Sequence, residues 1–454
     1  MNSLDPSSAA RPGTYALLSC FRLAVTTLLL SLLLAGIPLT ALQAQPVIDN
    51  VADIRMPADF NQVEFYLVTV DVGDRVWDNF GHTALRMVDL GSDTDLVFNW
   101  GLFDTSVGVF RFATNFALGI MNYQLGVSPP SWEFGRYQQE NRTVWQDRLR
   151  LNNAQKRTLY QRLAWNVRPE NISYDYDYFY DNCTTRVRDY IDEALNGALA
   201  DGSRALTQRT FRDEVLGHYA SVPLIGFSLN VLMNERIDQR MTQWQQMFLP
   251  AQLRSQLQRQ GLLDESEILM EFPAPQTQPG GHLVSGLMAL LTLGLLLSVR
   301  RASIASFSSQ PGFTLRWPQL SYRLLGLVGL IVALFSGVYG LMLSLGWWLS
   351  GHQDVHANVN LLLFWPTDLL ALGMVFSWLL KGRAYSVSTI RQQIIVTYLV
   401  LHLMAALVYV VMALFGLSGQ SLGTIALFVL PLLILFSLVS MIAGIQPVRS
   451  IRWG

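Results

Sequence analysis

The stretch YDNCTTR (residues 180–186) predicts a cysteine, Cys183, at the start of a helix. Apolar residues recur after it at helical spacing and predict a helix to about residue 200. They are Val187, Tyr190, Ile191, Ala194 and Leu195. Asp181 or Asn182 can cap this helix. The free N–H groups and the positive helix end would stabilise a thiolate and an oxyanion, so a nucleophilic thiol of lowered pKa is expected.

The second cysteine, Cys20, precedes an apolar run over residues 23–41 that is followed by Leu42-Gln43-Ala44-Gln45. This pattern predicts that residues 1–44 are a secretory signal cleaved after Ala44, or a retained N-terminal anchor. Cys20 then lies in a segment that is cytosolic or removed. Cys183 is left as an unpaired thiol in an oxidising compartment, which indicates a chemical role for it.

The chain has the composition of a membrane protein, since 51% of its 454 residues are hydrophobic and 14% are charged. About five later apolar runs approach or exceed the length that crosses a bilayer. They cover residues 283–299, 324–349, 361–380, 394–416 and 424–445. The net charge of −1 gives no indication of nucleic-acid binding.

Lys and Arg are confined to alternate loops of this region. They occur in 300–323, in 381–393 and after residue 445, but not in 350–360 or 417–423. The positive-inside rule places the basic loops in the cytoplasm and the region before residue 272 on the opposite side. We therefore expect an exported domain over 45–271, a Pro/Gly linker over 272–282 and a membrane domain over 283–454.

The exported region is predicted to be an α+β domain. Residues 62–71, 82–88 and 96–100 alternate as strands and are separated by turns, which predicts a β-meander with His82 at the start of its middle strand. Residues 143–151 are predicted as a further strand, and 152–166 as a helix capped by Asn152 or Asn153. Residues 105–126 are predicted as a short helix or a lipid-contacting flap, and 207–270 as mainly helical and polar.

His82 is the predicted general base for Cys183. It follows a glycine at a strand start, where a side chain can face a cleft, whereas His218 lies in a polar helical stretch and His282 at the membrane edge. Asn99, on the returning strand, is predicted to orient the imidazole, with Asp104 as the competing candidate. A plain packing or hydrogen-bonding role is the alternative for each of these residues. One cysteine with scattered histidines does not have metal-ligand spacing, and no cofactor is expected.

These residues resemble the Lnb N-terminal periplasmic domain family, whose best-known members are lipoprotein N-acyltransferases of bacteria. Three blocks carry the resemblance: Phe80-Gly81-His82-Thr83-Ala84, Phe98-Asn99-Trp100-Gly101-Leu102-Phe103-Asp104 and Tyr178-Phe179-Tyr180-Asp181-Asn182-Cys183-Thr184-Thr185-Arg186. The segment His352…Asn358-Val359-Asn360-Leu361-Leu362, followed by Pro366, resembles the membrane region of that family. The order of His before Cys also resembles circularly permuted papain-like folds, such as the lecithin–retinol acyltransferase group.

The resemblance implies a membrane-bound thiol acyltransferase of the bacterial inner membrane. Cys183 would take an acyl chain from a phospholipid as a thioester and pass it to an amine, the N-terminal cysteine of a diacylated lipoprotein. Arg186 lies one turn past Cys183 and could hold a lipid phosphate, or it could form a structural ion pair. Asp368 lies inside an apolar run, where it could be functional or could complement the start of a helix.

Two other classes of function compete with this expectation. The first is a periplasmic cysteine hydrolase, a peptidase or amidase acting on cell-wall peptide, although a hydrolase has little need for a multi-span membrane domain. The second is a non-catalytic, membrane-anchored module, against which the intact pair of Cys183 and His82 argues. The loop 350–360, with His352 and His356, could border the lipid side of the site or be a solvated loop.

Overall fold

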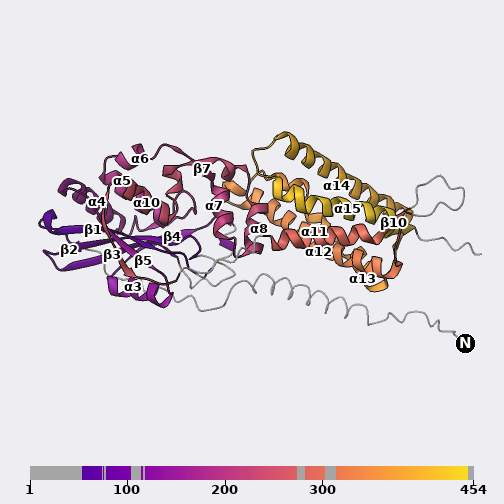
Figure 1. Ribbon diagram of the computed structural model, residues 1–454, viewed down its shortest axis with the longest axis horizontal. Coiled ribbons are helices and arrows are strands. Elements are labelled where there is room, and N and C mark those ends of the chain that lie inside the picture. Colours follow the sequence, from indigo (N-terminus) through magenta and orange to yellow (C-terminus); the bar gives the residue numbers. More distant parts are fainter. Residues whose placement is uncertain are drawn as a thin grey trace, which may run out of the picture. The chain divides into compact units, whose positions relative to one another are not determined.

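The computed structural model (Figure 1) describes residues 54–73, 75, 78–103, 114–115, 118–273, 282–301 and 313–447. The predicted signal or anchor, the competing Asp104, most of the predicted linker and much of the predicted flap lie outside these residues.

The region before the predicted linker is built on a seven-stranded antiparallel sheet in the order β6-β4-β3-β2-β1-β5-β9. Its strands are β1 (Val63–Val70), β2 (His82–Asp89), β3 (Thr94–Phe103), β4 (Asn122–Ser128), β5 (Val144–Leu149), β6 (Ser173–Asp175) and β9 (Leu263–Met270). The predicted meander is therefore present as β1-β2-β3, with His82 as the first residue of the middle strand.

The two faces of the sheet are covered by different helices, because the strands bury apolar side chains on both faces. On one face, Phe65 and Leu85 pack with Leu159 of α4 (Asn153–Asn166) and Ile191 of α5 (Cys183–Ala194). On the other face, Val68 packs with Tyr137 of α3 (Pro130–Gln139). Successive residues of a strand point to opposite faces, so β2 supplies side chains to both layers.

The helix that starts at Cys183 is shorter than predicted. It ends at Ala194 because Asn196 (φ 54°) and Gly197 (φ 86°) adopt the left-handed conformation that terminates helices. A short helix, α6 (Ala198–Asp201), follows the break. The predicted helix over 152–166 is confirmed as α4, and Asn152 is its cap.

Two predictions for the region before the linker are wrong in part. Residues 122–126 of the predicted helix or flap belong to β4, and 263–270 of the predicted polar helical region form the edge strand β9. The acidic side chains of β9 contact neighbours instead of lying on a solvated helix. Asp264 pairs with Arg148 of β5 and with Arg150, which follows β5, and Glu267 accepts a hydrogen bond from Gln146. Charged residues suit a strand at the edge of a sheet.

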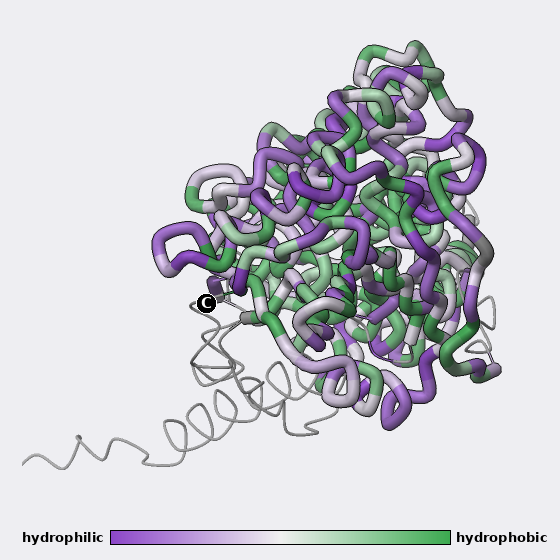
Figure 2. Tube along the Cα trace, turned by 90° about the vertical axis from the view of Figure 1, so that its left-hand side faces the viewer, coloured by the Kyte–Doolittle hydropathy of each residue, from purple (hydrophilic) through white to green (hydrophobic). Residues whose placement is uncertain are grey.

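The remaining elements of this region lie between α6 and β9. They are β7 (Leu206–Thr210), α7 (Phe211–His218), α8 (Pro223–Leu232), the 3₁₀-helix Glu235–Asp238, β8 (Arg240–Thr242), α9 (Gln243–Gln246) and α10 (Pro250–Arg259). A 3₁₀-helix, Phe60–Gln62, precedes β1. In contrast to the polar stretch predicted here, α8 is apolar. Figure 2 shows mostly hydrophilic outer loops around a more hydrophobic interior at the end that carries the sheet.

The membrane region contains three helices that are long and apolar enough to cross a bilayer, among the residues described. They are α12 (Pro318–Leu349), α14 (Thr389–Phe415) and the continuous helical segment Ile425–Gly444, which includes α15 (Leu430–Val439) between two π-helical turns. A bent pair, Gln353–Leu362 and Pro366–Lys381, is a fourth candidate, with 50° between its halves. The apolar helix α11 (Leu283–Ser298) has 16 residues and falls short of a full span.

The bent pair corresponds to the predicted run over 361–380. It consists of 3₁₀-helices over Gln353–Val355, Val359–Leu362 and Pro366–Ala371, followed by α13 (Leu372–Lys381). Two short strand pairs follow the ends of helices in this region. They are β10 (Val299–Arg301) with β11 (Phe313–Leu315), and β12 (Tyr385–Val387) with β13 (Ile445–Pro447).

Candidate active site

Cys183 is the first residue of α5, and Asn182 is the cap of that helix. The Asn182 Oδ1 atom accepts hydrogen bonds from the N–H groups of Thr184 (2.8 Å) and Thr185 (2.9 Å). Thr185 Oγ1 in turn accepts from the Asn182 N–H at 2.7 Å, which completes a capping box. Of the two predicted caps, the structure selects Asn182. The cap occupies the N–H groups of Thr184 and Thr185. Within the described part of the chain, the N–H group of Cys183 has no such bond from the cap, so it can donate to a ligand.

The thiol of Cys183 lies against the first residues of β2. Its Sγ atom lies 3.7 Å from Thr184 Oγ1, and the backbone of Thr83, which follows His82, is close enough to lower the pKa of the thiol. The hydroxyls of Thr83 and Thr184 are 3.1 Å apart and are both buried, which locks the start of α5 to β2. The structure thus places the predicted nucleophile at the start of β2, beside Thr83, the residue that follows the predicted base His82.

The resting thiol is neutral rather than ionised. Burial raises the pKa of Cys183, and this effect outweighs the opposing hydrogen bonds from Thr83 and Thr184. The predicted lowering of the thiol pKa by the helix start is therefore wrong for this state of the site, because a desolvated thiolate is costlier than the helix end can offset.

His82 and Asn99 are directly bonded, as the sequence predicts. The Nε2 atom of His82 lies 2.7 Å from Oδ1 of Asn99, which is buried on β3. An amide oxygen accepts only, so Nε2 carries a proton and Nδ1 is the basic nitrogen. Burial, together with the positive charges of Arg136 and Arg142, lowers the pKa of His82 to about 3. The imidazole is therefore neutral in the resting site.

A buried carboxylate, Glu133 of α3, supports this pair from behind. It accepts hydrogen bonds from Asn99 Nδ2 (3.1 Å) and Ser128 Oγ (3.0 Å), and it pairs with Arg136 at 3.1 Å. The sequence analysis missed Glu133. Its only local signal is an acidic residue in the first turn of a helix that begins Pro129-Pro130, and such residues usually favour the helix dipole without a further role.

Tyr174 is a second residue that the sequence analysis did not single out. Its side chain is buried, and its hydroxyl has no hydrogen-bond partner within the part of the chain that the structure describes. Burial raises the pKa of Tyr174, and the nearby Cys183 raises it further, so the hydroxyl stays protonated. The core cluster that holds Tyr174 also packs against Cys183 and Tyr176.

Arg186 is engaged by protein groups. Its guanidinium makes two hydrogen bonds to the Asp181 carboxylate, at 2.6 and 2.7 Å, and lies 3.9 Å above the ring of Tyr174. The ion-pair alternative of the sequence analysis is thus present, and a role in holding a lipid phosphate stays a prediction. Asp181, the other predicted cap of α5, serves as the partner of Arg186 instead.

The other histidines near this region have structural contacts. The Nδ1 atom of His218 lies 2.7 Å from the carbonyl oxygen of Asn79, and its ring packs 4.6 Å from the ring of Phe80. His282 is the N-terminal flanking residue of α11. Among the described residues, no group of three or more His, Cys, Asp or Glu side chains could hold a metal ion.

Residues 52–213 match the family model of the Lnb N-terminal periplasmic domain. The chain carries an Lnb N-terminal periplasmic domain. This finding confirms the resemblance over the part that contains Cys183, His82 and Asn99. The chain matches no curated protein and no solved structure. With its long apolar helices, the chain is accordingly a membrane protein with a periplasmic domain.

The matched Lnb region ends before α8, and α8 is held by membrane-region residues. The side chain of Asn358 donates to the carbonyls of Val231 (3.0 Å) and Leu232 (2.9 Å), and Asn360 donates to Val231 at 2.8 Å. A helix leaves its last carbonyls without internal partners, so these two asparagines cap α8. The buried Arg212 completes the cap by donating to the Asn230, Met233 and Asn234 carbonyls.

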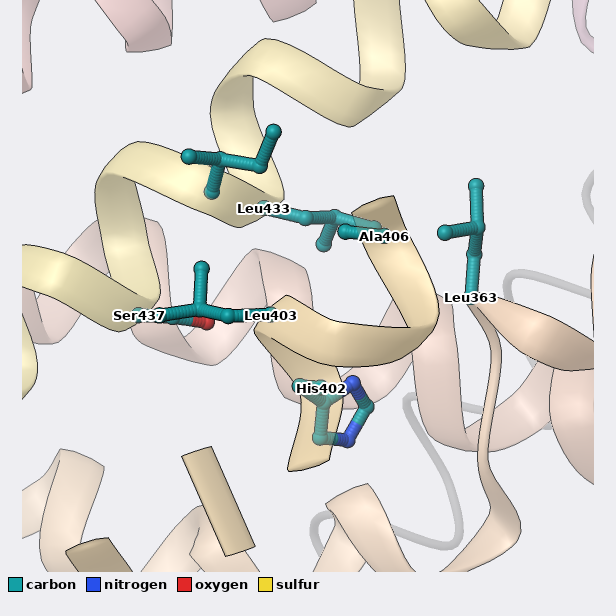
Figure 3. A pocket seen from close by; sticks show the side chains of 7 residues that line it. Leu363, His402, Leu403, Ala406, Leu433 and Ser437 are labelled. Atoms are coloured by element: carbon teal, nitrogen blue, oxygen red, sulfur yellow. The ribbon is translucent and has the colours of Figure 1, made fainter. Parts of the chain in front are cut away.

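Asp368 sits where the bent pair of membrane helices resumes. It accepts hydrogen bonds from Tyr398 (2.7 Å) and Ser336, and one oxygen lies 3.0 Å from Nε2 of His402. It also accepts a long hydrogen bond of 3.4 Å from the Trp365 N–H, at the start of the 3₁₀-helix Pro366–Ala371. Of its two predicted roles, this contact fits the one of complementing a helix start. His402 borders a cavity of about 10 Å³, room for about one water, that Ser437 and apolar side chains complete (Figure 3).

Proposed function

We propose that this protein is a membrane-bound thiol acyltransferase that moves an acyl chain from a phospholipid, through a thioester on Cys183, to an amine. The observation that supports this best is the position of the thiol at the capped start of α5, which is bonded through Thr184 to Thr83, the residue that follows His82. The acceptor that the Lnb resemblance favours is the N-terminus of a lipoprotein. The expected location is the bacterial inner membrane, in a multi-pass arrangement with the catalytic domain in the periplasm.

In the first half-reaction, Nδ1 of His82 accepts the proton of the Cys183 thiol as Sγ attacks the ester carbonyl of the lipid. The negative oxygen that forms is stabilised by the Cys183 N–H at the positive start of α5. The ester C–O bond then breaks, and the lysophospholipid oxygen leaves with the proton held by His82. The products of this step are a Cys183 thioester, a lysophospholipid and a neutral imidazole.

In the second half-reaction, the amine attacks the thioester carbonyl and passes a proton to His82. The C–S bond breaks, and the sulfur recovers a proton from the imidazolium, which leaves an amide and the resting thiol. A neutral thiol beside a neutral base suits this scheme, because proton transfer accompanies attack in each direction. A circularly permuted papain-like arrangement, with the base on a strand before the cysteine helix, belongs to this proposal.

The membrane region supports a lipid donor. Phe227 and Val231 of α8 share a core cluster with Tyr339, Leu343 and Leu363 of the membrane region. The catalytic region is therefore packed directly onto the membrane helices, which holds the thiol near a bilayer-resident substrate. A hydrolase of cell-wall peptide would gain little from such packing.

The test is detection of the thioester. Purified full-length protein in which Cys20 is replaced (Cys20→Ser) is incubated in liposomes with labelled phospholipid, and Cys183 is analysed by mass spectrometry for a hydroxylamine-sensitive acyl adduct. The matched variants are Cys183→Ala and His82→Ala. We expect an adduct without these replacements, none with Cys183→Ala, and formation slowed by roughly 10²- to 10⁴-fold with His82→Ala.

The other outcomes separate the competing functions. A thiol that reacts quickly with a small electrophile but forms no acyl adduct would overturn the proposal in favour of a cysteine hydrolase. A thiol that is inert to both reagents would leave a non-catalytic membrane-anchored module.

A further inference from the structure

The loop between two membrane helices reaches the segment that precedes the nucleophile. The hydroxyl of Tyr178 donates a hydrogen bond to the carboxylate of Asp354, and the ring of Tyr178 lies 5.1 Å from that of His352. Burial raises the pKa of Tyr178, and the Asp354 carboxylate raises it further, so the hydroxyl keeps the proton that it donates. The loop 350–360 is therefore a bonded neighbour of the site rather than a solvated loop.

Tyr178 is connected through the backbone to the cap of α5. Its carbonyl oxygen accepts a hydrogen bond from Asn182 Nδ2 at 2.9 Å. Asp177 and Asp181 exchange two backbone hydrogen bonds (3.1 and 3.0 Å), which closes the turn between them. The Asp177 side chain also accepts from the N–H of Phe179 at 2.8 Å. A displacement of Tyr178 in this tight turn must move Asn182 and, with it, the start of α5.

Asp354 is itself held in place by a buried clamp. The Asn234 N–H donates to the Asp354 carbonyl at 2.6 Å, and the Asn234 side-chain amide donates to the carbonyls of Gln353 (2.9 Å) and His356 (2.7 Å). Asn234 is buried, so all three bonds are shielded from water. The carboxylate that receives the Tyr178 hydroxyl is thus presented by a rigid backbone.

We propose that Asp354 is a positioning residue for the nucleophile: through Tyr178 and Asn182, the membrane loop sets the place of Cys183 relative to its base. Asp354 touches none of the reacting atoms, and it acts only by holding the turn at residues 177–182. This inference rests on the proposed role of Cys183 as the nucleophile. It makes the membrane region part of the catalytic geometry in addition to an anchor.

The test is a double-mutant cycle in the full-length protein carrying Cys20→Ser, in liposomes. Tyr178→Phe removes the donor and keeps the ring, and Asp354→Ala removes the acceptor. We expect each variant to slow acyl-adduct formation by roughly 10- to 100-fold with little change in KM for the phospholipid, because misplacement of a reacting group affects mainly the chemical step. The double variant should be no slower than either single one. Asp354→Asn, which keeps an acceptor, should recover much of the rate.

Glu235→Ala is the matched control. Glu235 accepts a hydrogen bond from the Gly419 N–H at 3.1 Å, so it also joins the catalytic region to a membrane loop, but it has no bond to Tyr178. It should leave the rate unchanged. Additive losses in the cycle, or an equal loss with Glu235→Ala, would overturn the positioning role.

A second readout separates this inference from the proposed function. The rate of Cys183 alkylation by iodoacetamide should change in Tyr178→Phe and Asp354→Ala, whether or not an acyl adduct forms. If no variant forms an adduct but alkylation responds as expected, the proposed function fails and the link from Asp354 to the thiol stands. If the adduct forms and both rates are the same in every variant, the proposed function stands and the link is wrong.

Discussion

The carboxylate of Glu133 sets the direction of the Asn99 amide. The NH₂ group of Asn99 donates to Glu133 at 3.1 Å, so its oxygen must point the other way, toward His82 Nε2 at 2.7 Å. The proton of His82 is thereby kept on Nε2, and Nδ1 is left as the base. Glu133 thus controls which nitrogen of His82 carries the proton, although it contacts the imidazole only through Asn99.

Replacement of Glu133 by glutamine is expected to slow acyl-adduct formation. A glutamine can donate as well as accept, so the Asn99 amide is free to flip and the His82 tautomer is no longer fixed. We expect a loss of roughly 10- to 100-fold in the rate, the range found for residues that orient a reacting group from behind, measured by single-turnover mass spectrometry. Glu140→Gln, at the end of the same helix, is the control and should retain the rate. Equal rates in the two variants would contradict this role of Glu133.

The thiol should behave as a neutral group near pH 7. Because burial raises the pKa of Cys183, its alkylation by iodoacetamide should be slow at neutral pH and should still increase above pH 8.5, the ordinary thiol pKa. The measurement is the second-order alkylation rate from about pH 5 to 10 with Cys20→Ser. A fast rate that is constant between about pH 5 and 8 would instead indicate a thiolate–imidazolium pair.

Loss of the Asn182 cap should impair both stability and chemistry. Asn182→Ala removes two bonds to the start of α5 and leaves buried groups unpaired, so we expect a loss of about 2 kcal/mol in the free energy of unfolding. The matched control is Asn152→Ala, which removes the cap of α4 with the same capping box but on an exposed site. Only Asn182→Ala should alter the alkylation rate of Cys183. A change of that rate in Asn152→Ala as well would point to general destabilisation.

The ion pair of Arg186 can be distinguished from a phosphate-binding role by comparing it with Asp181. Both side chains are partly exposed, so loss of the pair should cost about 1 kcal/mol or less. If the pair is the main role, Arg186→Ala and Asp181→Ala should have the same effect on thermal unfolding, with no further loss in the double variant and no change in KM for phospholipid. A higher KM that is confined to Arg186→Ala would instead support contact with a lipid phosphate.

Asp368 is expected to be needed for the stability of the membrane region. Asp368→Leu would leave Tyr398 and Ser336 without their acceptor, at a cost of about 1 to 3 kcal/mol for each unpaired buried group. Asp368→Asn keeps an acceptor and should lose less. The measurement is thermal unfolding in detergent, followed by tryptophan fluorescence. An Asp368→Asn variant that is as stable as the unmodified protein but forms no acyl adduct would contradict a purely structural role.

Local sequence signals were enough to predict the meander, the α5 start and the contact between His82 and Asn99. Each depends on neighbours within one hairpin or one helical turn, where alternation and capping residues are informative. The choice between Asp181 and Asn182 was not available locally, because both can cap. It was decided by Arg186, which takes Asp181 as its partner.

The features that the sequence did not reveal depend on partners far along the chain. Glu133 meets Asn99 across 34 positions, and Tyr178 meets Asp354 across 176. The strand β9 is polar because it lies at an edge, where Asp264 pairs with Arg148 and Arg150, so its pattern resembled a solvated helix. The thiol pKa was mispredicted because burial depends on the packed core and not on the helix start alone.

The capping of α8 by membrane-region residues determines which fragments of this chain can fold separately. A fragment that stopped at the predicted linker would lose Asn358 and Asn360, and the carbonyls of Val231 and Leu232 would have no donor. Phe227 and Val231 would lose the apolar surface on which they pack. Although the Pro/Gly-rich linker separates the periplasmic and membrane regions in the sequence, we therefore expect the two regions to unfold together as one cooperative unit.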